Sequence, residues 1–335
     1  MRIILFVVLF FSGSSLWSQS PEKLADSLKT GFRGLSVVND SVYWMSGRKG
    51  LIGNTTTGGE KWMWNRIKNH EQLDFRSLHA FDKNRAVVAS AGTPAVILTT
   101  ENGGKSWVRC YFNNDSAMFF DGLGFWDEKH GLIFGDPVNG RMFLMETFDA
   151  VTWKEIPFED RPILHPGEAS FAASGTTIRV LPGGHVYIAT GGAVSRLWHS
   201  RDYGHHWEVF ATPIIQGQPS QGIFSIAFRD SLNGIIVGGD YLKPDSTDRN
   251  VFVTNDGGKT WITPAVPTKG YRSCVEFIGP ELAFAIGPGG MEFSPNDGLH
   301  WIATTGSGNT IKGGGNNRII YAGGKTSYFS SFTLK

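Results

Sequence analysis

Basic residues recur at one position of a repeated segment, and their spacing is the clearest indication of chemistry in the sequence. The segment begins with an aromatic or apolar residue and occurs seven times. Its second residue is, in chain order, Arg33, Arg76, Asp121, Ala172, Ser225, Arg272 and Lys312. If the units close into a ring, the four cations form an arc around one end of a central channel, and Asp121 ends the arc. Cations confined in a partly dry funnel would attract a carboxylate, a sulfate, a phosphate or an acidic peptide.

The same cations also have a structural interpretation. Charged side chains are rarely buried without partners, so each arginine could pair with a nearby carboxylate, for example Arg76 with Asp74, and only fix the channel wall. The two interpretations are compatible, because a channel wall lined by paired charges can still form a binding site.

Acidic residues form a second candidate set at the channel mouth. Besides Asp121 it contains Asp136 in GDPVNG, Glu168 in GEASF, and Asp240 with Tyr241 in GGDY. The glycines beside Asp136 and Asp240 would allow a ligand to approach the backbone closely. With the arginines, this set resembles a sialidase, in which an arginine triad holds a carboxylate and a tyrosine activated by glutamate is the nucleophile. The Phe/Tyr-Arg-Ile-Pro motif of sialidases is absent, however, and acids that cap turns are the alternative.

A turn motif at regular intervals indicates which elements position these residues. Thr254 to Trp261 reads TNDGGKTW, in which a hydroxyl residue and an aspartate can accept backbone N–H bonds and the glycines supply positive φ. Related stretches begin at Thr55, Thr100, Ser200 and Ser294, with a shorter copy at Thr147. Their closing tryptophans, at positions 62, 107, 153, 207, 261 and 301, are 40 to 54 residues apart. Such a period indicates an array of supersecondary units, with the tryptophans in the core.

Each unit contains short strands rich in β-branched and aromatic residues, and no long helical period interrupts them. Four strands per unit predict an all-β fold, a seven-bladed β-propeller with these turns between the last two strands of most blades. The last unit, Ile311 to Lys335, lacks the motif, so we expect it to supply three strands. A strand from Lys23 to Thr30 would complete it, unless that segment forms a helical turn.

The N-terminus has the regions of a secretory signal peptide. Arg2 precedes an apolar run from Ile3 to Phe11, which is too short to span a bilayer, and small and polar residues follow. We predict a signal peptide over residues 1–18 with cleavage near Ser18, one propeller domain over 19–335, and a secreted or periplasmic protein. Cys110 and Cys274 fall in units that are not neighbours, so both are expected to be free, buried thiols.

Several motifs together carry a family resemblance. The turn motifs resemble Asp-box repeats of the bacterial neuraminidase type, and the order FRGLSVVND, DFRSLHAFD, GDPVNG, GEASFAASGT and VGGDY resembles exported bacterial relatives of the photosystem II stability/assembly factor family. This resemblance covers residues 30–335 and implies a seven-bladed propeller that acts in assembly. Some relatives are labelled oxidoreductases, but the sequence has no GxGxxG after a strand, no CxxC and no haem-attachment motif.

The leading hypothesis is therefore an exported, non-catalytic propeller that binds a protein or peptide, possible roles being assembly or maturation. The alternatives are a sialidase-like glycosidase acting on acidic glycans and an oxidoreductase. A net charge of +1 gives no reason to expect nucleic acid or a membrane surface as partner. We expect a monomer without cofactor or metal, since His205 and His206 have no identifiable further ligands.

Overall fold

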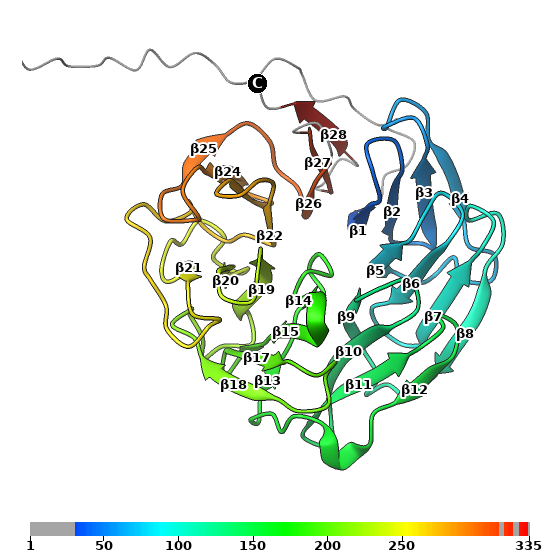
Figure 1. Cartoon of the computed structure of the whole chain (residues 1–335), viewed down its shortest axis with the longest axis horizontal. Helices are drawn as coiled ribbons and strands as arrows, with labels where there is room; N and C mark the ends of the chain where they lie inside the picture. The colour runs from blue at the N-terminus through cyan, green and yellow to red at the C-terminus, as the bar shows by residue number, and fades with distance from the viewer. Residues whose placement is uncertain (1–30, 315–317, 324–327, 334–335) are drawn as a thin grey trace, which may run out of the picture.

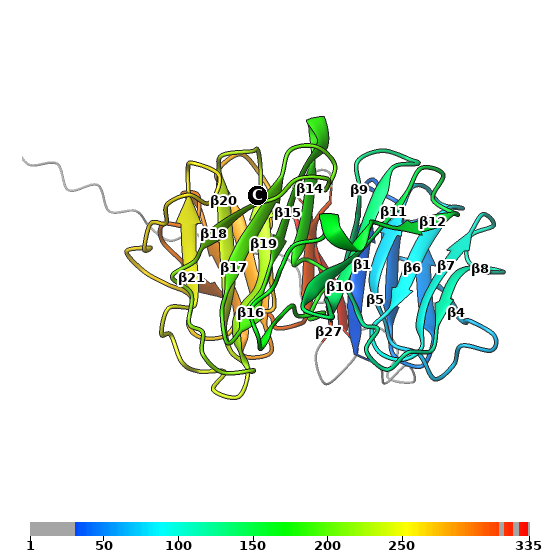
Figure 2. The ribbon, with the colours of Figure 1, turned by 90° about the horizontal axis from the view of Figure 1, so that it is seen from below.

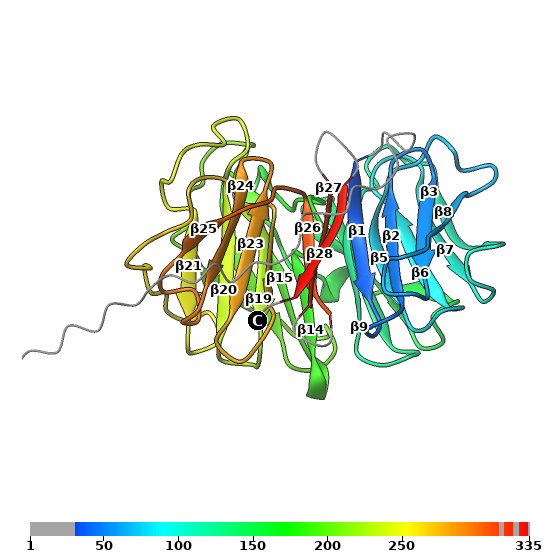
Figure 3. The same cartoon turned by 90° about the horizontal axis from the view of Figure 1, so that it is seen from above.

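The computed structural model describes residues 31–314, 318–323 and 328–333, and shows β-sheets arranged radially around a central channel (Figure 1). Seen from the side, the sheets stand upright next to one another (Figures 2 and 3). The first strand of each unit lies innermost, so its side chains form the channel wall. The predicted all-β propeller is confirmed.

Within the described residues, five sheets have four strands each. The first contains β1 (Phe32–Val37), β2 (Tyr43–Gly47), β3 (Leu51–Thr55) and β4 (Met63–Arg66). The second contains β5 (Phe75–Ala80), β6 (Ala86–Ser90), β7 (Ala95–Thr100) and β8 (Val108–Asn113). The third contains β9 (Phe120–Phe125), β10 (Gly131–Val138), β11 (Arg141–Thr147) and β12 (Trp153–Glu155). The fourth contains β14 (Ile178–Leu181), β15 (His185–Ala189), β17 (Arg196–Ser200) and β18 (Glu208–Ala211). Another contains β22 (Cys274–Phe277), β23 (Ala283–Gly287), β24 (Gly290–Ser294) and β25 (Ile302–Thr304).

The two remaining sheets depart from this plan. One has five strands, because the short β13 (Glu168–Ala169) and β16 (Gly191–Gly192) extend β19 (Gln221–Phe228), β20 (Gly234–Asp240) and β21 (Val251–Thr254). The other has three strands, β26 (Thr310–Gly313), β27 (Arg318–Gly323) and β28 (Tyr328–Thr333). Two 3-10 turns complete the elements, η2 (Phe158–Asp160) and η3 (Pro182–Gly184).

The prediction of seven blades requires correction. In the part of the chain that the structure describes, six sheets have four or five strands and form complete blades. The sheet β26–β28 has three strands, because the final repeat ends without the turn motif that precedes a fourth strand elsewhere. The segment Lys23 to Thr30, which we expected to complete that sheet, lies outside the described residues.

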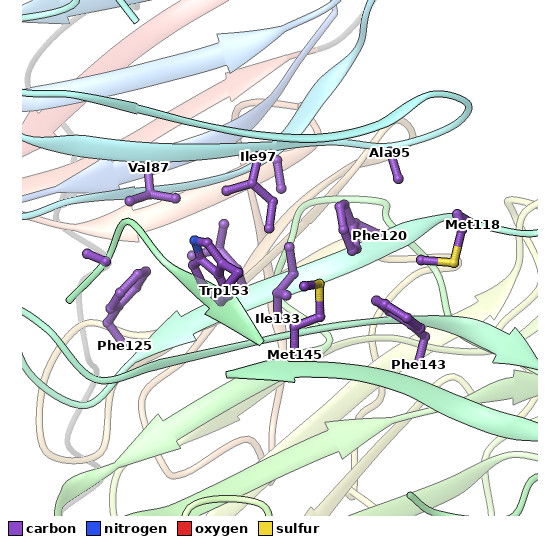
Figure 4. Close-up of a cluster of buried hydrophobic side chains, with 13 residues drawn as sticks. Val87, Ala95, Ile97, Met118, Phe120, Phe125, Ile133, Phe143, Met145 and Trp153 are labelled. Carbon is purple, nitrogen blue, oxygen red and sulfur yellow. The ribbon is translucent and has the colours of Figure 1, made fainter. Parts of the chain in front are cut away.

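The hydrophobic core lies between the faces of neighbouring sheets. In the cluster between the second and third blades, Val87 and Ile97 of β6 and β7 pack against Phe120, Ile133 and Met145 of β9–β11 (Figure 4). These strands are fully or nearly fully buried along their length, because each sheet is covered on both faces by its neighbours. Burial of apolar area between blades therefore holds the ring together and fixes the channel wall.

Five of the turn motifs lie between the third and fourth strands of a blade, and the sixth, Thr254 to Trp261, follows β21 and is closed by an isolated bridge between Val253 and Ile262. In Thr254 to Trp261, the Thr254 hydroxyl accepts the N–H of Gly258 at 2.8 Å, and Oδ1 of Asp256 accepts the N–H of Thr260 at 2.9 Å. Gly257 and Gly258 have positive φ of 80° and 93°, which a side chain would disfavour. The closing tryptophans Trp153 and Trp301 are buried, whereas the other four are half-buried.

Both cysteines are free thiols, as predicted, but only Cys274 is buried. Cys110 is partly exposed because it lies on β8, the outermost strand of its blade, where one face meets solvent. No helix among the described residues is long and apolar enough to cross a bilayer.

Candidate functional site

Two of the predicted arginines project into one end of the channel because of irregularities in their strands. The pairing of β1 with β2 shifts register between Phe32 and Gly34, and that of β5 with β6 shifts between Phe75 and Ser77. Arg33 and Arg76 are therefore the extra residues of two β-bulges, which redirect a side chain that regular pleating would place elsewhere.

These arginines line a cavity of about 480 Å³, called the mouth cavity below. Its floor is aromatic: the rings of Phe171 and Phe224 stack with centroids 3.9 Å apart, and Tyr271 meets Phe224 edge-on at 4.7 Å. Other parts of the wall come from Phe119, Asp136, Ser170, Ala172, Ala173, Tyr241, Pro244, Pro288, Ser273 and Asn309. A largely apolar hollow with a few polar groups is the usual form of a ligand site.

Arg33 and Arg76 differ in how their charges are balanced. Arg76 Nε donates to Asp74 Oδ2 at 2.8 Å, the pair proposed as the structural alternative, and Arg76 Nη1 donates to the carbonyl of Ala172 at 3.3 Å. Arg33 Nη1 donates to the carbonyl of Ala173 at 2.6 Å, and no described carboxylate forms an ion pair with it. Burial, followed by repulsion from Arg76, lowers the pKa of Arg33. Arg33 thus retains a charge that an anionic ligand group could balance.

Behind the mouth cavity lies Asp121, whose side chain is fully buried. Neither of its oxygens has a well-formed hydrogen bond from the described residues. Burial raises its pKa well above the usual range, and the nearby carboxyl of Asp136 raises it further, while Arg76 and the N–H of Ala172 act in the opposite direction. Burial also raises the pKa of Asp136, which does line the cavity. Burial therefore favours the protonated, uncharged form of Asp121 in the native state relative to the unfolded chain, which limits how far this carboxyl offsets Arg33.

Arg272 does not join the two arginines at the mouth. Its side chain is 1% exposed and donates from Nε and Nη2 to the two carboxyl oxygens of Glu292, which is itself 2% exposed. Arg272 precedes β22, and the next residue, Ser273, is the one that faces the mouth cavity. Arg272 lies before the paired residues of β22, and its backbone N–H donates to the carbonyl of Gly238 on β20 at 3.1 Å.

Lys312 lies further along the channel than Arg33, as strand pairing shows. In the first blade Ser36 pairs with Trp44, which is three residues before Gly47 at the end of β2. In the last sheet Lys312 pairs with Ile320, which is likewise three residues before Gly323 at the end of β27. Lys312 is therefore equivalent to Ser36 and not to Arg33. Its Nζ donates to Glu276 Oε2 at 2.7 Å, in a second cavity of the channel. The predicted arc of four cations is thus not formed.

The predicted acids are also separated. Glu168 is buried and accepts from Arg196 Nη2 at 2.6 Å, and Asp240 accepts the N–H of Leu242 at 3.0 Å. Tyr241 does line the mouth cavity and is 48% exposed. The set does not assemble the sialidase-like arrangement, because Arg272 and Glu168 are occupied by other partners.

The sequence interpretation missed the aromatic floor. Each of these aromatic residues, Phe171, Phe224 and Tyr271, is the first residue of a repeated segment, and the sequence interpretation used them only as residues that favour strands. The signal that could have found them is the recurrent aromatic residue directly before the variable second position. It also missed Arg179, whose Nη1 donates to Glu276 Oε1 at 3.1 Å, because nothing in the local sequence places these two strands together.

Among the described residues, no group of three or more His, Cys, Asp or Glu could hold a metal ion.

The fold and the mouth cavity define a β-propeller with a ligand-sized hollow at one end of its channel. A family model described as photosynthesis system II assembly factor YCF48 matches residues 17–117. No curated protein sequence matches the chain.

Solved structures with a similar fold include three propellers. One described as YCF48 bound to D1 peptide has a TM-score of 0.66 at 13% identity, covering 97% of this chain and 100% of that one. YCF48 from Cyanidioschyzon merolae has a TM-score of 0.65 at 17% identity, covering 91% and 96%. The WD40 propeller domain of Doa1 has a TM-score of 0.63 at 10% identity, covering 91% and 94%. The family model confirms the resemblance to the photosystem II assembly factor family over residues 17–117, and the solved structures share the propeller fold; the expectation that the relatives are exported stays a prediction.

Proposed function

We propose that this chain is a non-catalytic propeller that binds an extended peptide segment of a partner protein in the mouth cavity, as an assembly factor acting as a monomer. The observation that carries the proposal is Arg33, a largely enclosed cation in an aromatic hollow with no carboxylate partner among the described residues. A similar fold bound to a peptide, in the structure described as YCF48 bound to D1 peptide, supports the same conclusion.

The cavity chemistry specifies what the peptide should carry. A carboxylate, from an acidic side chain or a chain end, would accept charge-assisted hydrogen bonds from Arg33. An apolar or aromatic side chain beside it would pack on Phe224 and Tyr271, whose ring edges and faces line the floor. Asp136 on the wall could accept a backbone N–H of the peptide. Tyr241 and the exposed Leu242 extend an apolar surface outward from the rim.

The test uses a synthetic peptide library with free C-terminal carboxylates, matched by the same peptides with amidated ends. We expect binders to share an acidic group next to an apolar residue, and Arg33→Gln to weaken their binding by roughly tenfold or more, because a hydrogen bond to a charged group is lost. Arg85→Gln is the matched control, since Arg85 pairs with the exposed Glu128 and does not line the mouth cavity. Binding that survives Arg33→Gln unchanged would contradict the proposal.

The compartment in which the partner is found depends on whether residues 1–18, which lie outside the described residues, direct export of the protein. We propose that they form a signal peptide cleaved near Ser18, so that the partner belongs to the periplasm or the exterior. N-terminal sequencing of the protein recovered from the host envelope should begin at or beside Gln19. An intact Met1 in the mature protein would refute export by this route.

A further inference from the structure

A second cavity, of about 470 Å³, lies along the same channel and takes no part in the proposed peptide site. Its wall comes from later positions of the innermost strands, such as Ser36 of β1, Arg179 of β14 and Lys312 of β26. The mouth cavity is instead lined by residues near or just before strand starts, such as Arg33, Ser273 and Asn309. Because these strands line the channel side by side (Figure 1), the two cavities follow one another along it, and Arg76 contributes to both.

The second cavity carries more positive than negative charge. Its charged lining residues are Arg76, Arg179, Lys312 and Glu276, and Arg76 is already balanced by Asp74. Two cations therefore share the single carboxylate of Glu276, at 3.1 Å for Arg179 Nη1 and 2.7 Å for Lys312 Nζ. One positive charge remains without a counter-charge among the described lining residues. His79 does not add to it at neutral pH, because burial and then Lys312 lower its pKa to about 4.

The residues that line this cavity also keep hydrogen-bond donors that are not used within the described protein. Glu276 is 7% exposed and holds Arg179 and Lys312 in place, although each of these comes from a different blade. Each cation donates one described hydrogen bond, so Lys312 keeps two N–H groups and Arg179 keeps four. Ser36 accepts the N–H of Ala80 at 3.0 Å, which leaves its own O–H free to donate. Preorganised donors around an excess positive charge are the usual requirements of an oxyanion site.

We propose that the second cavity binds a small dianion, a phosphate group or a short dicarboxylate, between Lys312, Arg179 and Ser36. One oxygen would accept from the Lys312 ammonium and another from the Arg179 guanidinium, while Glu276 continues to orient both. The contrasting interpretation is that the three charged residues only join their blades and hold no ligand. The two interpretations differ in whether the protein has a saturable anion site that depends on Lys312.

The test is calorimetric titration of the purified full chain, at low ionic strength, with inorganic phosphate in one arm and succinate in the other. We expect one saturable site for at least one of the two anions, and the arm that binds distinguishes a phosphate group from a dicarboxylate. Lys312→Met should weaken binding by roughly tenfold or more, because the remaining Arg179 and Glu276 then balance each other. Lys312→Arg, which keeps the charge, should bind within about threefold of the original protein.

Two further variants keep the result interpretable. Glu276→Gln frees both cations and should tighten anion binding several-fold, an effect that a purely structural trio of charges does not produce. Arg33→Gln should leave phosphate and succinate binding unchanged, and Lys312→Met should leave peptide capture at the mouth unchanged. Absence of a saturable site in both arms would overturn the proposal. So would loss of anion binding in Arg33→Gln with retention in Lys312→Met, which would assign the anion to the mouth cavity.

Discussion

Glu292→Gln is expected to lower the free energy of unfolding by about 3–5 kcal/mol, because it leaves the Arg272 guanidinium buried without a counter-charge. Arg272 is 1% exposed and Glu292 is 2% exposed, so solvent cannot replace the lost partner. The carboxylate also accepts the backbone N–H of Lys269 at 3.2 Å, which ties the loop before β22 to β24. Urea unfolding followed by tryptophan fluorescence measures the loss.

Two comparisons separate an unpaired charge from a simple loss of packing. The double variant Arg272→Met with Glu292→Met should recover most of the lost stability, since hydrophobic replacement of both members of a buried pair is often neutral or favourable. Glu128→Gln, which removes the partner of Arg85 on an exposed rim, should cost less than about 1 kcal/mol. A Glu292→Gln protein as stable as the original would show that the pair does not support the fold.

The same pair affects the mouth cavity, because Arg272 also donates from Nη1 to the carbonyl of Tyr271 at 2.7 Å. Tyr271 and Ser273, on either side of Arg272, line that cavity. The buried pair therefore positions part of the wall of the mouth cavity without lining the cavity itself. We infer that the arginine predicted as a ligand contact acts on the site through the backbone that it anchors.

The fold was predictable because its signals are local. A hydroxyl, a carboxylate, glycines and a tryptophan within eight residues specify each turn, and their period specifies the blade. The blade count was less accessible, since it depends on how many strands the last repeat contributes and the motif that marks a fourth strand is missing there. The pair of Arg76 with Asp74 was also visible in the sequence, because its members are two residues apart.

The arrangement of the site depended on information that is not local. Bulges at Arg33 and Arg76 shift the register by one residue, and such irregularities have no fixed sequence signature. Alignment on the first residue of each segment also equated Lys312 with Arg33, three positions away from Ser36, the residue to which pairing with β27 makes it equivalent. The carboxylates that accept from Arg272 and Lys312 are 20 and 36 residues away in the sequence and lie on other strands, β24 and β22. Side-chain charge was evident in the sequence, but its neutralisation was not.

Asp121→Asn is expected to raise the free energy of unfolding at neutral pH, because the neutral amide removes the cost of keeping a buried carboxyl protonated above its unfolded-state pKa. The reason is the raised pKa of Asp121, caused first by burial and then by Asp136. Above the unfolded-state value of about 3.9, the unfolded chain releases this proton while the native state retains it. Native Asp121 therefore binds more protons than unfolded Asp121, and its contribution to stability falls as the pH rises.

The pH dependence is the decisive part of this prediction. The stability advantage of Asp121→Asn over the original protein should grow as the pH rises above about 3.9 and should vanish below it, where the aspartate is protonated in both the native and the unfolded state. Urea unfolding of both proteins at about pH 3.5, 5 and 7 measures how the difference in their free energies of unfolding changes with pH. Asp245→Asn on an exposed loop is the control and should change stability by less than about 0.5 kcal/mol throughout.

The opposite result would reverse the electrostatic account of the mouth cavity. If Asp121→Asn were less stable than the original protein at pH 7 and equal to it at low pH, Asp121 would be ionised and would stabilise Arg76 and Arg33. The mouth would then carry no surplus charge for a peptide carboxylate. If the variant is more stable and still captures the same peptides, the uncompensated charge of Arg33 is intrinsic to the native state, and a ligand carboxylate is the group that balances it.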